Sequence, residues 1–256
     1  MPDLVAAAGG IGPLAWLVAV IFAAYALRGA TGFGAGVVAI PMLALALPLP
    51  VVIVLITITG LLASLGQLTH QFRHVDWRAL RHLVLPMVCG VALGLWLFAA
   101  LDAQLLLRIF AVFIIGYGLL SLAALRPRAA HGRWIAVPAG AAGGLVATLF
   151  GGMAGPFYVV YLSALGLDKA RFRASMAVVL FTLSLVRLGG YGGLGLLDAR
   201  ALVLLAVSLP VMAVAMWAGE RWHQRWNEAT FRRVISLLLV SSGVALLAKS
   251  LSDSAA

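Results

Sequence analysis

The chain has 256 residues and is far more apolar than a water-soluble domain. Hydrophobic residues make up 64% of it, charged residues make up 10%, and the mean hydropathy is +1.10, which excludes an ordinary soluble globular protein. A formal net charge of +10 would suit nucleic acid, but the basic residues lie mainly in short loops beside apolar runs, without the basic and aromatic stripe that holds a nucleic acid strand. We therefore expect an integral membrane protein whose surroundings are a lipid bilayer, with no nucleic acid as a partner.

Several apolar runs are long enough to cross a bilayer as helices. A helix needs about 20 apolar residues for this, whereas a barrel would need many short alternating strands, which the sequence does not contain. In chain order, the clean runs lie at 51–70, 83–101, 104–125, 172–190, 200–219 and 231–251. Two more stretches, 11–48 and 134–167, are interrupted by glycine clusters, so each predicts either a pair of spans or a re-entrant pair of half-helices. The predicted fold class is an all-α membrane protein with about 8 to 10 membrane segments.

Basic loops predict which ends of the segments face the cytoplasm, because Lys and Arg are enriched on that side. The basic loops lie at 71–82, 126–133, 168–173 and 220–233. The turns without Lys or Arg lie at 48–50, 101–103 and 191–199. By this pattern, 11–48 begins and ends outside, whereas 134–167 begins and ends inside.

These opposite orientations predict two inverted repeats, 1–125 and 134–256, joined by the cytoplasmic loop 126–133. Each repeat would contain a glycine-interrupted hairpin followed by three transmembrane helices. Many secondary transporters are built in this way, and paired broken segments at corresponding positions are the best sequence indication of their binding site. The plan therefore favours a transporter over other classes of membrane protein.

The glycine clusters are the strongest local pattern in the chain. The first contains Gly32, Gly34 and Gly36, followed by Pro41, and the second contains Gly151, Gly152 and Gly155, followed by Pro156. Glycine permits positive φ, proline discourages a continuous helix, and a helix that starts after such a break presents free N–H groups and a positive dipole end to an anion. The alternative is that small residues let membrane helices pack closely. Two clusters at corresponding positions favour the anion site.

The charged residues also favour an anionic substrate. Every carboxylate lies in a loop, at a terminus or at a segment edge: Asp3, Asp76, Asp102, Asp168, Asp198, Glu220, Glu228 and Asp253. Transporters of cations and protons commonly keep such groups in the membrane core. Arg28, directly before the first cluster, and Arg187, inside an apolar run, either pair with sulfonate, sulfite or carboxylate oxygens or extend to the membrane interface.

No pattern for catalysis or for metal binding accompanies these features. The histidines lie at span ends or in loops without ligand spacing, and neither a Ser-His-Asp arrangement nor a phosphate-binding loop is present. We therefore expect no enzyme activity, no metal and no cofactor. The sequence leaves the oligomeric state open, a homo-oligomer included. Candidate polar side chains for the lining of a site are Thr31, Thr57, Thr59, Thr148, Tyr158, Ser175, Thr182 and Ser184.

Four stretches resemble the sulfite exporter TauE/SafE family, also called the toluene-sulfonate uptake permeases. They are GATGFGAGVVAIPML at 29–43, FRHVDWRALRHLVLPMVCGVALGLWL at 72–97, LFGGMAGPFYVVYLSALGLDKARFRASMAVVLFTLSLVRL at 149–188 and NEATFRRVISLLLVSSGVALL at 227–247. The resemblance implies a multi-pass carrier of the bacterial inner membrane for small sulfur anions such as sulfite and sulfonates, with export frequent among members.

The resemblance also implies positions for the substrate site. The family's first signature falls on Gly32, Phe33, Gly34, Gly36 and Pro41, and its second on Phe150, Gly151, Gly155, Pro156 and Arg173. Where members often show further glycines or a second proline, this chain has Ala35, Ala154 and Phe157, and the bulk of Phe157 is expected to narrow the pocket. The predicted substrate-binding residues are Arg28, Thr31, Gly32, Phe33, Gly34, Gly36, Pro41, Phe150, Gly151, Gly152, Gly155, Pro156, Tyr158 and Arg187.

The functional hypothesis is a secondary transporter that exports small anions, foremost sulfite, sulfonates and related sulfur compounds, by alternating access. One alternative is a passive anion channel on the same architecture. A second is a divalent-metal exporter, which the lack of intramembrane carboxylates disfavours. A third is a membrane-embedded enzyme or an assembly subunit, for which the sequence offers neither a catalytic pair nor a soluble domain.

Overall fold

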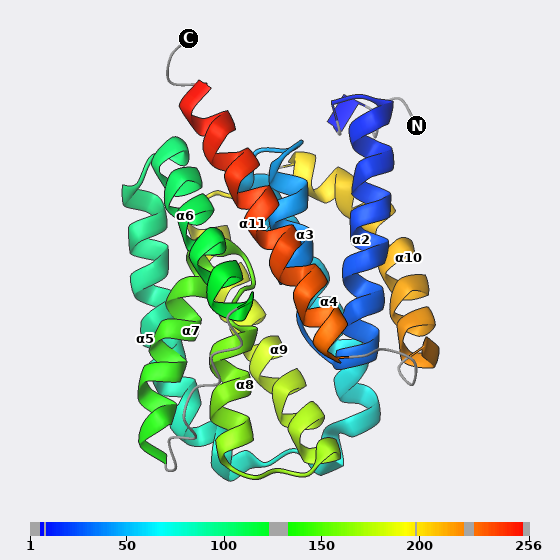
Figure 1. Ribbon diagram of the computed structural model, residues 1–256. Helices are drawn as coiled ribbons and strands as arrows, with labels where there is room; N and C mark the ends of the chain where they lie inside the picture. Colours follow the sequence, from blue (N-terminus) through cyan, green and yellow to red (C-terminus); the bar gives the residue numbers. More distant parts are fainter. Residues whose placement is uncertain (1–5, 8, 123–132, 198, 223–227, 253–256) are drawn as a thin grey trace.

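The computed structural model describes residues 6–7, 9–122, 133–197, 199–222 and 228–252, and all regular structure in these ranges is helical (Figure 1). In chain order the helices are α2 (Ile11–Thr31), α3 (Ala35–Ala44), α4 (Leu49–Gln71), the 3₁₀ turn η1 (Phe72–His74), α5 (Trp77–Ala100), α6 (Ala103–Leu122), the 3₁₀ turn η2 (Arg133–Ile135), α7 (Ala136–Phe150), α8 (Gly155–Ala164), α9 (Lys169–Gly193), α10 (Ala199–Trp222) and α11 (Glu228–Ser252).

Seven of the described helices are long and apolar enough to cross a membrane, namely α2, α4, α5, α6, α9, α10 and α11. The all-α membrane fold is therefore confirmed. In the interrupted stretches, α3 and α8 have ten residues each, so each rises about 15 Å, roughly half the thickness of the hydrocarbon core. Each stretch is thus a longer helix followed by a short returning helix, and neither is a pair of complete spans.

The helix boundaries differ from the predicted ones at the basic ends, because two carboxylates cap helices there. The Asp76 side chain accepts a hydrogen bond from the Ala79 N–H at 3.0 Å, and α5 consequently starts at Trp77. Asp168 accepts from the Arg171 N–H at 2.9 Å and caps α9. The predicted loops 71–82 and 168–173 therefore belong largely to helices. The joining loop 126–133, apart from its last residue, and residues 123–125 of a predicted span lie outside the described residues.

The most extensive contacts between elements join α5 to α7, α6 to α11, α2 to α10 and α4 to α9. Each of these pairs combines a helix from 1–125 with a helix from 134–256. The beginning of α2 and the end of α11 lie on the same side of the molecule, at the upper end in Figure 1. The helices α3, α4 and α9 therefore lie at the centre, where the two parts of the chain meet.

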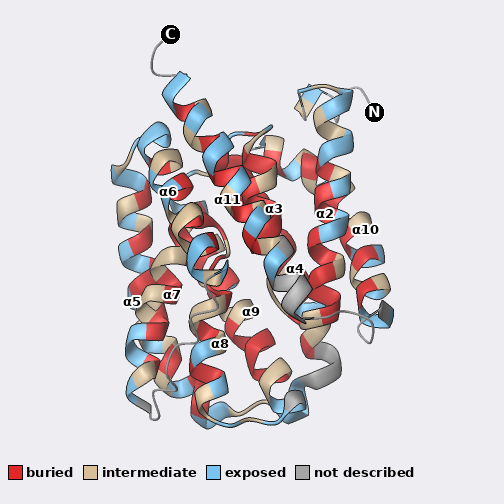
Figure 2. Cartoon of the chain, viewed as in Figure 1, coloured by how far each residue is buried: buried red, intermediate tan, exposed pale blue. Residues whose placement is uncertain are grey.

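Burial follows this arrangement. Most residues of α3 are buried, and more of α4 is buried than of α5, α6 or α10 (Figure 2). The outer helices expose large apolar side chains, which suits contact with lipid: Leu85, Leu93, Trp96, Val112, Leu120, Val214 and Trp217. The apolar outer surface and the buried centre are those of a helical membrane protein.

Glycines outside the two clusters support close packing of the outer pairs. A Cβ atom on Gly29 would clash with the backbone of α10 at Met216, and one on Gly219 would clash with the backbone of α2 at Ala26. In the α5 and α7 pair, a Cβ atom on Gly90 would likewise clash with the backbone of α7, and one on Gly144 would clash with the backbone of α5. For these four residues, the packing interpretation of membrane glycines is correct.

Candidate functional site

The two glycine clusters, far apart in the sequence, meet at the centre of the molecule. Gly32 and Gly34 have φ of 89° and 91°, and they separate α2 from α3. Gly151, with φ of 78°, and Gly152, with φ of 151°, separate α7 from α8 in the same way. A Cβ atom on Gly36 would lie 3.1 Å from the Cα atom of Gly152. The two breaks are therefore in direct backbone contact.

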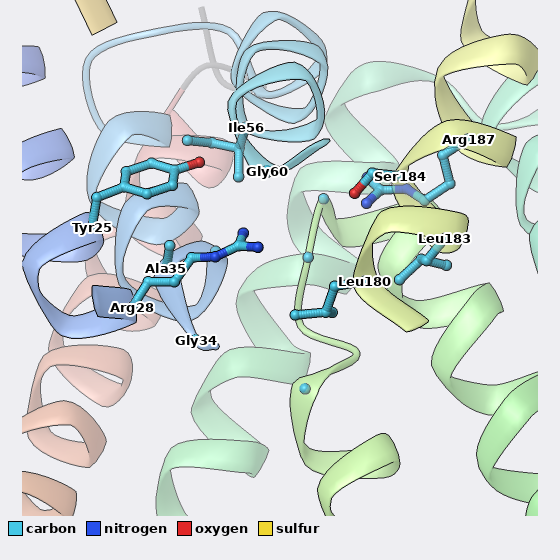
Figure 3. A pocket seen from close by; sticks show the side chains of 14 residues that line it. Tyr25, Arg28, Gly34, Ala35, Ile56, Gly60, Leu180, Leu183, Ser184 and Arg187 are labelled. Carbon is cyan, nitrogen blue, oxygen red and sulfur yellow. The ribbon is translucent and has the colours of Figure 1, made fainter. Parts of the chain in front are cut away.

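A cavity lies where the breaks meet. Its volume between the lining atoms, including the part open to solvent, is about 450 Å³, and we call it the central cavity. The helices α3 and α8 both begin at its wall (Figure 3), so their positive dipole ends face this region, together with Ala35 and Gly36 of α3 and Gly155 of α8. The lining residues are Tyr25, Arg28, Gly34, Ala35, Gly36, Ile56, Gly60, Gly151, Gly152, Gly155, Leu180, Leu183, Ser184 and Arg187.

Arg28 from α2 and Arg187 from α9 point toward one another across this cavity (Figure 3). Their exposed fractions are 5% and 2%, so neither side chain extends to the membrane interface. Nη2 of Arg28 donates to the Ser64 hydroxyl at 2.5 Å. The Nε atoms of both arginines have no hydrogen-bond partner within the described part of the chain. Both side chains therefore keep donor capacity that the protein does not use.

Among the described residues, no carboxylate lines the central cavity. The ion pair found in the described ranges joins Arg171 to Asp168 at 3.3 Å on the exposed surface. A buried cation without a counter-ion is costly in a low-dielectric interior. Two such cations beside two helix N-termini form a site that an anion would stabilise.

Tyr191 holds Arg187 in place, although the sequence analysis did not find it. The Tyr191 hydroxyl accepts a hydrogen bond from Nη2 of Arg187 at 3.1 Å and donates to the Thr148 carbonyl oxygen at 2.5 Å. The guanidinium also lies over the tyrosine ring, 5.5 Å from its centroid. Because Thr148 is in the last turn of α7, this contact fixes the arginine relative to the second glycine break.

Replacing Tyr191 by phenylalanine is therefore expected to raise the KM for the transported anion about tenfold, because a hydrogen bond to a charged group contributes roughly 1.5–3 kcal/mol. The matched control is Tyr161→Phe, which also removes a hydrogen bond from a buried tyrosine to a backbone carbonyl, that of Ala79. Both variants should lose similar thermal stability in detergent, but only Tyr191→Phe should change KM. An unchanged KM in Tyr191→Phe would show that Tyr191 has only a structural role.

Other predicted site residues lie beside the central cavity. Thr31, Phe33 and Pro156 line a neighbouring, mainly apolar cavity of about 800 Å³ that shares Gly34 with the central one. The Thr31 hydroxyl accepts from the Phe33 N–H at 3.3 Å and so stabilises the turn after α2. Gly32 faces Arg173, whose Nε would lie 3.6 Å from a Cβ atom at this glycine.

Three of the predicted residues are buried in the packing around the cavity and do not line it. Pro41 lies inside α3. The Phe150 ring packs against Phe113 at a centroid distance of 5.0 Å, and Tyr158 is buried where a Cβ atom on Gly143 would clash with its ring. Phe157 does not line the central cavity either, so the expected narrowing by its side chain is wrong for this cavity.

Among the candidate polar residues, Ser184 lines the central cavity. The hydroxyls of Thr57, Thr59 and Thr148 instead donate to carbonyl oxygens one turn back in their own helices. Tyr25 was missed, yet it lines the cavity and donates to Thr59 Oγ1 at 2.6 Å. Residues three or four apart share a helix face, so the spacing of Tyr25 from Arg28 was a usable signal.

Comparison with known proteins identifies the family of the chain. The family model for the sulfite exporter TauE/SafE matches residues 17–246. A protein of Cupriavidus necator described as a probable sulfite/organosulfonate exporter TauE is 29% identical over 249 residues, which cover 94% of this chain and 96% of the relative. A probable inner membrane transporter protein TsaS of Comamonas testosteroni is 28% identical over 178 residues, covering 68% of this chain and 74% of the relative. No solved structure gives a significant match. The chain therefore belongs to the sulfite exporter TauE/SafE family of membrane transporters.

Proposed function

We propose that this protein is a secondary transporter that exports small sulfur oxyanions, sulfite or organosulfonates, across the bacterial inner membrane. The observation that carries the proposal is the pair of buried arginines, Arg28 and Arg187, in a cavity whose described lining residues include no carboxylate. The two relatives, described as a probable sulfite/organosulfonate exporter and a probable inner membrane transporter, support the substrate class and the location.

The arrangement of donors supports binding of a compact oxyanion. The oxygens of a sulfite or sulfonate group can accept hydrogen bonds from the guanidinium groups of Arg28 and Arg187, and charge-assisted bonds of this kind are the strongest available. The starts of α3 and α8 add positive potential, and the backbone of Ala35, Gly36 and Gly155 at these starts lines the cavity. Since the apolar side chains of Ile56, Leu180 and Leu183 form part of the wall, the site is partly shielded from water, which strengthens these interactions.

Transport is proposed to proceed by alternating access of two inverted halves, 1–125 and 134–256. If the halves are related by a two-fold axis, α2 corresponds to α7 and α5 corresponds to α10. The contact of α2 with α10 is then equivalent to that of α5 with α7, and both are among the most extensive in the molecule. In Figure 1, α2 starts at the upper end and α7 starts at the lower end, as inversion requires. Rocking of the halves around a site at their interface would open it to either side in turn.

The driving force is proposed to be the membrane potential acting on the anion itself. In the part of the chain that the structure describes, the lining of the central cavity contains neither a carboxylate nor a histidine that could carry a coupled proton. A potential that is negative inside favours the exit of an anion by about 2.3 kcal/mol per charge per 100 mV. Export of a charged sulfur oxyanion would therefore need no further ion.

Proteoliposomes loaded with ³⁵S-labelled sulfite test this function. We expect saturable efflux that accelerates when valinomycin and a potassium gradient make the interior negative, and we expect external unlabelled sulfite to drive counterflow. A passive channel would conduct without counterflow. Transport of neither sulfite nor short-chain sulfonates, or flux of divalent cations instead, would overturn the proposal.

A further inference from the structure

A second cavity lies at the end of the molecule where the basic residues gather. Its volume between the lining atoms, including its open part, is about 1,090 Å³, and we call it the entrance cavity. It lies between the last turns of α4 and α10 and the beginning of α9, at the lower end in Figure 1. The residues that line it are Gly29, Leu62, Ala63, Gly66, Gln67, Arg173, Met212, Ala213, Met216, Trp217 and Glu220.

The wall of the entrance cavity reaches the central site. Gln67 lines the entrance cavity, and its Oε1 atom accepts a hydrogen bond from Nη2 of Arg28 at 3.4 Å. Gly29, which also lines the entrance cavity, directly follows Arg28 in α2. Arg28 itself lines the central cavity. One arginine therefore contacts the walls of both cavities.

Arg173 is the basic residue of the entrance cavity. Its Nε atom is buried and has no hydrogen-bond partner within the described residues. The acidic residue of the lining, Glu220, is exposed near the end of α10, and no ion pair joins it to Arg173 in the described part of the chain. By contrast, Arg171, two residues earlier in α9, is exposed and paired with Asp168. The charge of Arg173 is thus free to act on a solute in the cavity.

We propose that the entrance cavity is the cytoplasmic entrance to the central site and that Arg173 binds the incoming anion there before it passes to Arg28. This inference rests on the proposed function. A positive charge in a cleft with low-dielectric walls concentrates anions and raises their rate of arrival. The ligand chemistry is a small anionic oxygen-bearing group. An anionic lipid headgroup would offer the same chemistry. Lipid could reach this cavity because Leu62 and Trp217 are exposed in its lining.

The test uses the full-length protein with a thiol introduced by Ala213→Cys, at an exposed position of the cavity lining. The exposed native cysteine is removed by Cys89→Ser. In inside-out vesicles, the introduced thiol is modified with an anionic sulfonatoethyl thiosulfonate and with a cationic trimethylammonioethyl analogue. We expect Arg173→Gln to lower the ratio of the anionic to the cationic rate about fivefold, as one unit charge roughly 8 Å away would do. The matched control, Arg171→Gln, should leave the ratio unchanged.

Protection identifies the occupant. Methanesulfonate should slow modification in the parent protein and should lose this effect in Arg173→Gln, in vesicles of zwitterionic lipid alone. Any one of three results would overturn the inference. The Arg173 and Arg171 variants could give equal ratios of the anionic to the cationic rate, the thiol could react only from the outer face, or only added phosphatidylglycerol could protect it. Labelling does not require transport, so the difference between Arg173→Gln and Arg171→Gln should persist even if the protein transports neither sulfite nor sulfonates and the proposed function fails.

Discussion

Replacing Arg28 or Arg187 by glutamine is expected to abolish anion transport while leaving the protein folded. Loss of one partner from a buried, hydrogen-bonded charge pair costs about 2–5 kcal/mol, which corresponds to a loss of affinity of roughly 30-fold to several thousand-fold. Both side chains line the central cavity and neither faces a carboxylate there. The lysine variants should retain part of the activity, because lysine keeps the charge but loses the planar fork of donors.

The stability of the same variants separates a binding role from a structural role. An unpaired buried charge destabilises the empty protein, so its removal should leave the melting temperature in detergent unchanged or raise it. Sulfite should raise the melting temperature of the parent protein, because a ligand stabilises the state that binds it, and this effect should disappear in Arg28→Gln and Arg187→Gln. Arg171→Gln, which removes an exposed charge, serves as the control with normal transport. If both glutamine variants melt earlier and still respond to sulfite, the central cavity is not the anion site.

The membrane segments were predictable from the sequence because apolar length alone decides them. The six clean runs all correspond to long helices, and the interrupted stretches are broken at the predicted glycines. The boundaries at the basic ends were wrong because Arg78, Arg81 and Arg171 suggested loops by their charge. The caps formed by Asp76 and Asp168 outweigh this signal, since a capped first turn readily carries charged side chains on its exposed face.

The site was only partly predictable, because it depends on which helix faces meet. Arg28 and Arg187 stood out in the sequence as cations in apolar surroundings, and their burial excludes extension of either side chain to the membrane interface. Tyr191 carried no such signal, since its role depends on α9 passing the end of α7. Phe150 follows the family signature but packs against Phe110 and Phe113, so a signature residue need not contact the solute.

The glycines of the bundle fall into two groups, those that face a neighbouring backbone and those that line the central cavity. Gly29 and Gly219 bring the backbones of α2 and α10 together away from the glycine breaks. Gly34 and Gly155 line the central cavity, where a side chain would occupy the space of the solute. Gly36 combines both roles, because it lines the cavity and also faces the backbone of Gly152. Substitutions at glycines that face a backbone should therefore impair folding, whereas substitutions at glycines that only line the cavity should impair transport.

Gly36→Leu is expected to prevent stable folding, whereas Gly155→Ala should yield a folded protein with impaired transport. A Cβ atom on Gly36 would lie 3.1–3.2 Å from the Cα, C and O atoms of Gly152, so the rest of a leucine side chain would meet backbone that can move only by separating the two breaks. Overpacking of this kind costs about 1–3 kcal/mol and sometimes more. At Gly155 the neighbour within 3.3 Å is the half-buried Phe33 ring, which can turn aside.

The matched control is Gly116→Leu in α6, where no atom lies within 4 Å of the added Cβ. Size-exclusion profiles and melting temperatures in detergent report folding, and sulfite efflux reports function. A monodisperse Gly36→Leu protein with the melting temperature of Gly116→Leu would show that the two breaks do not touch as described.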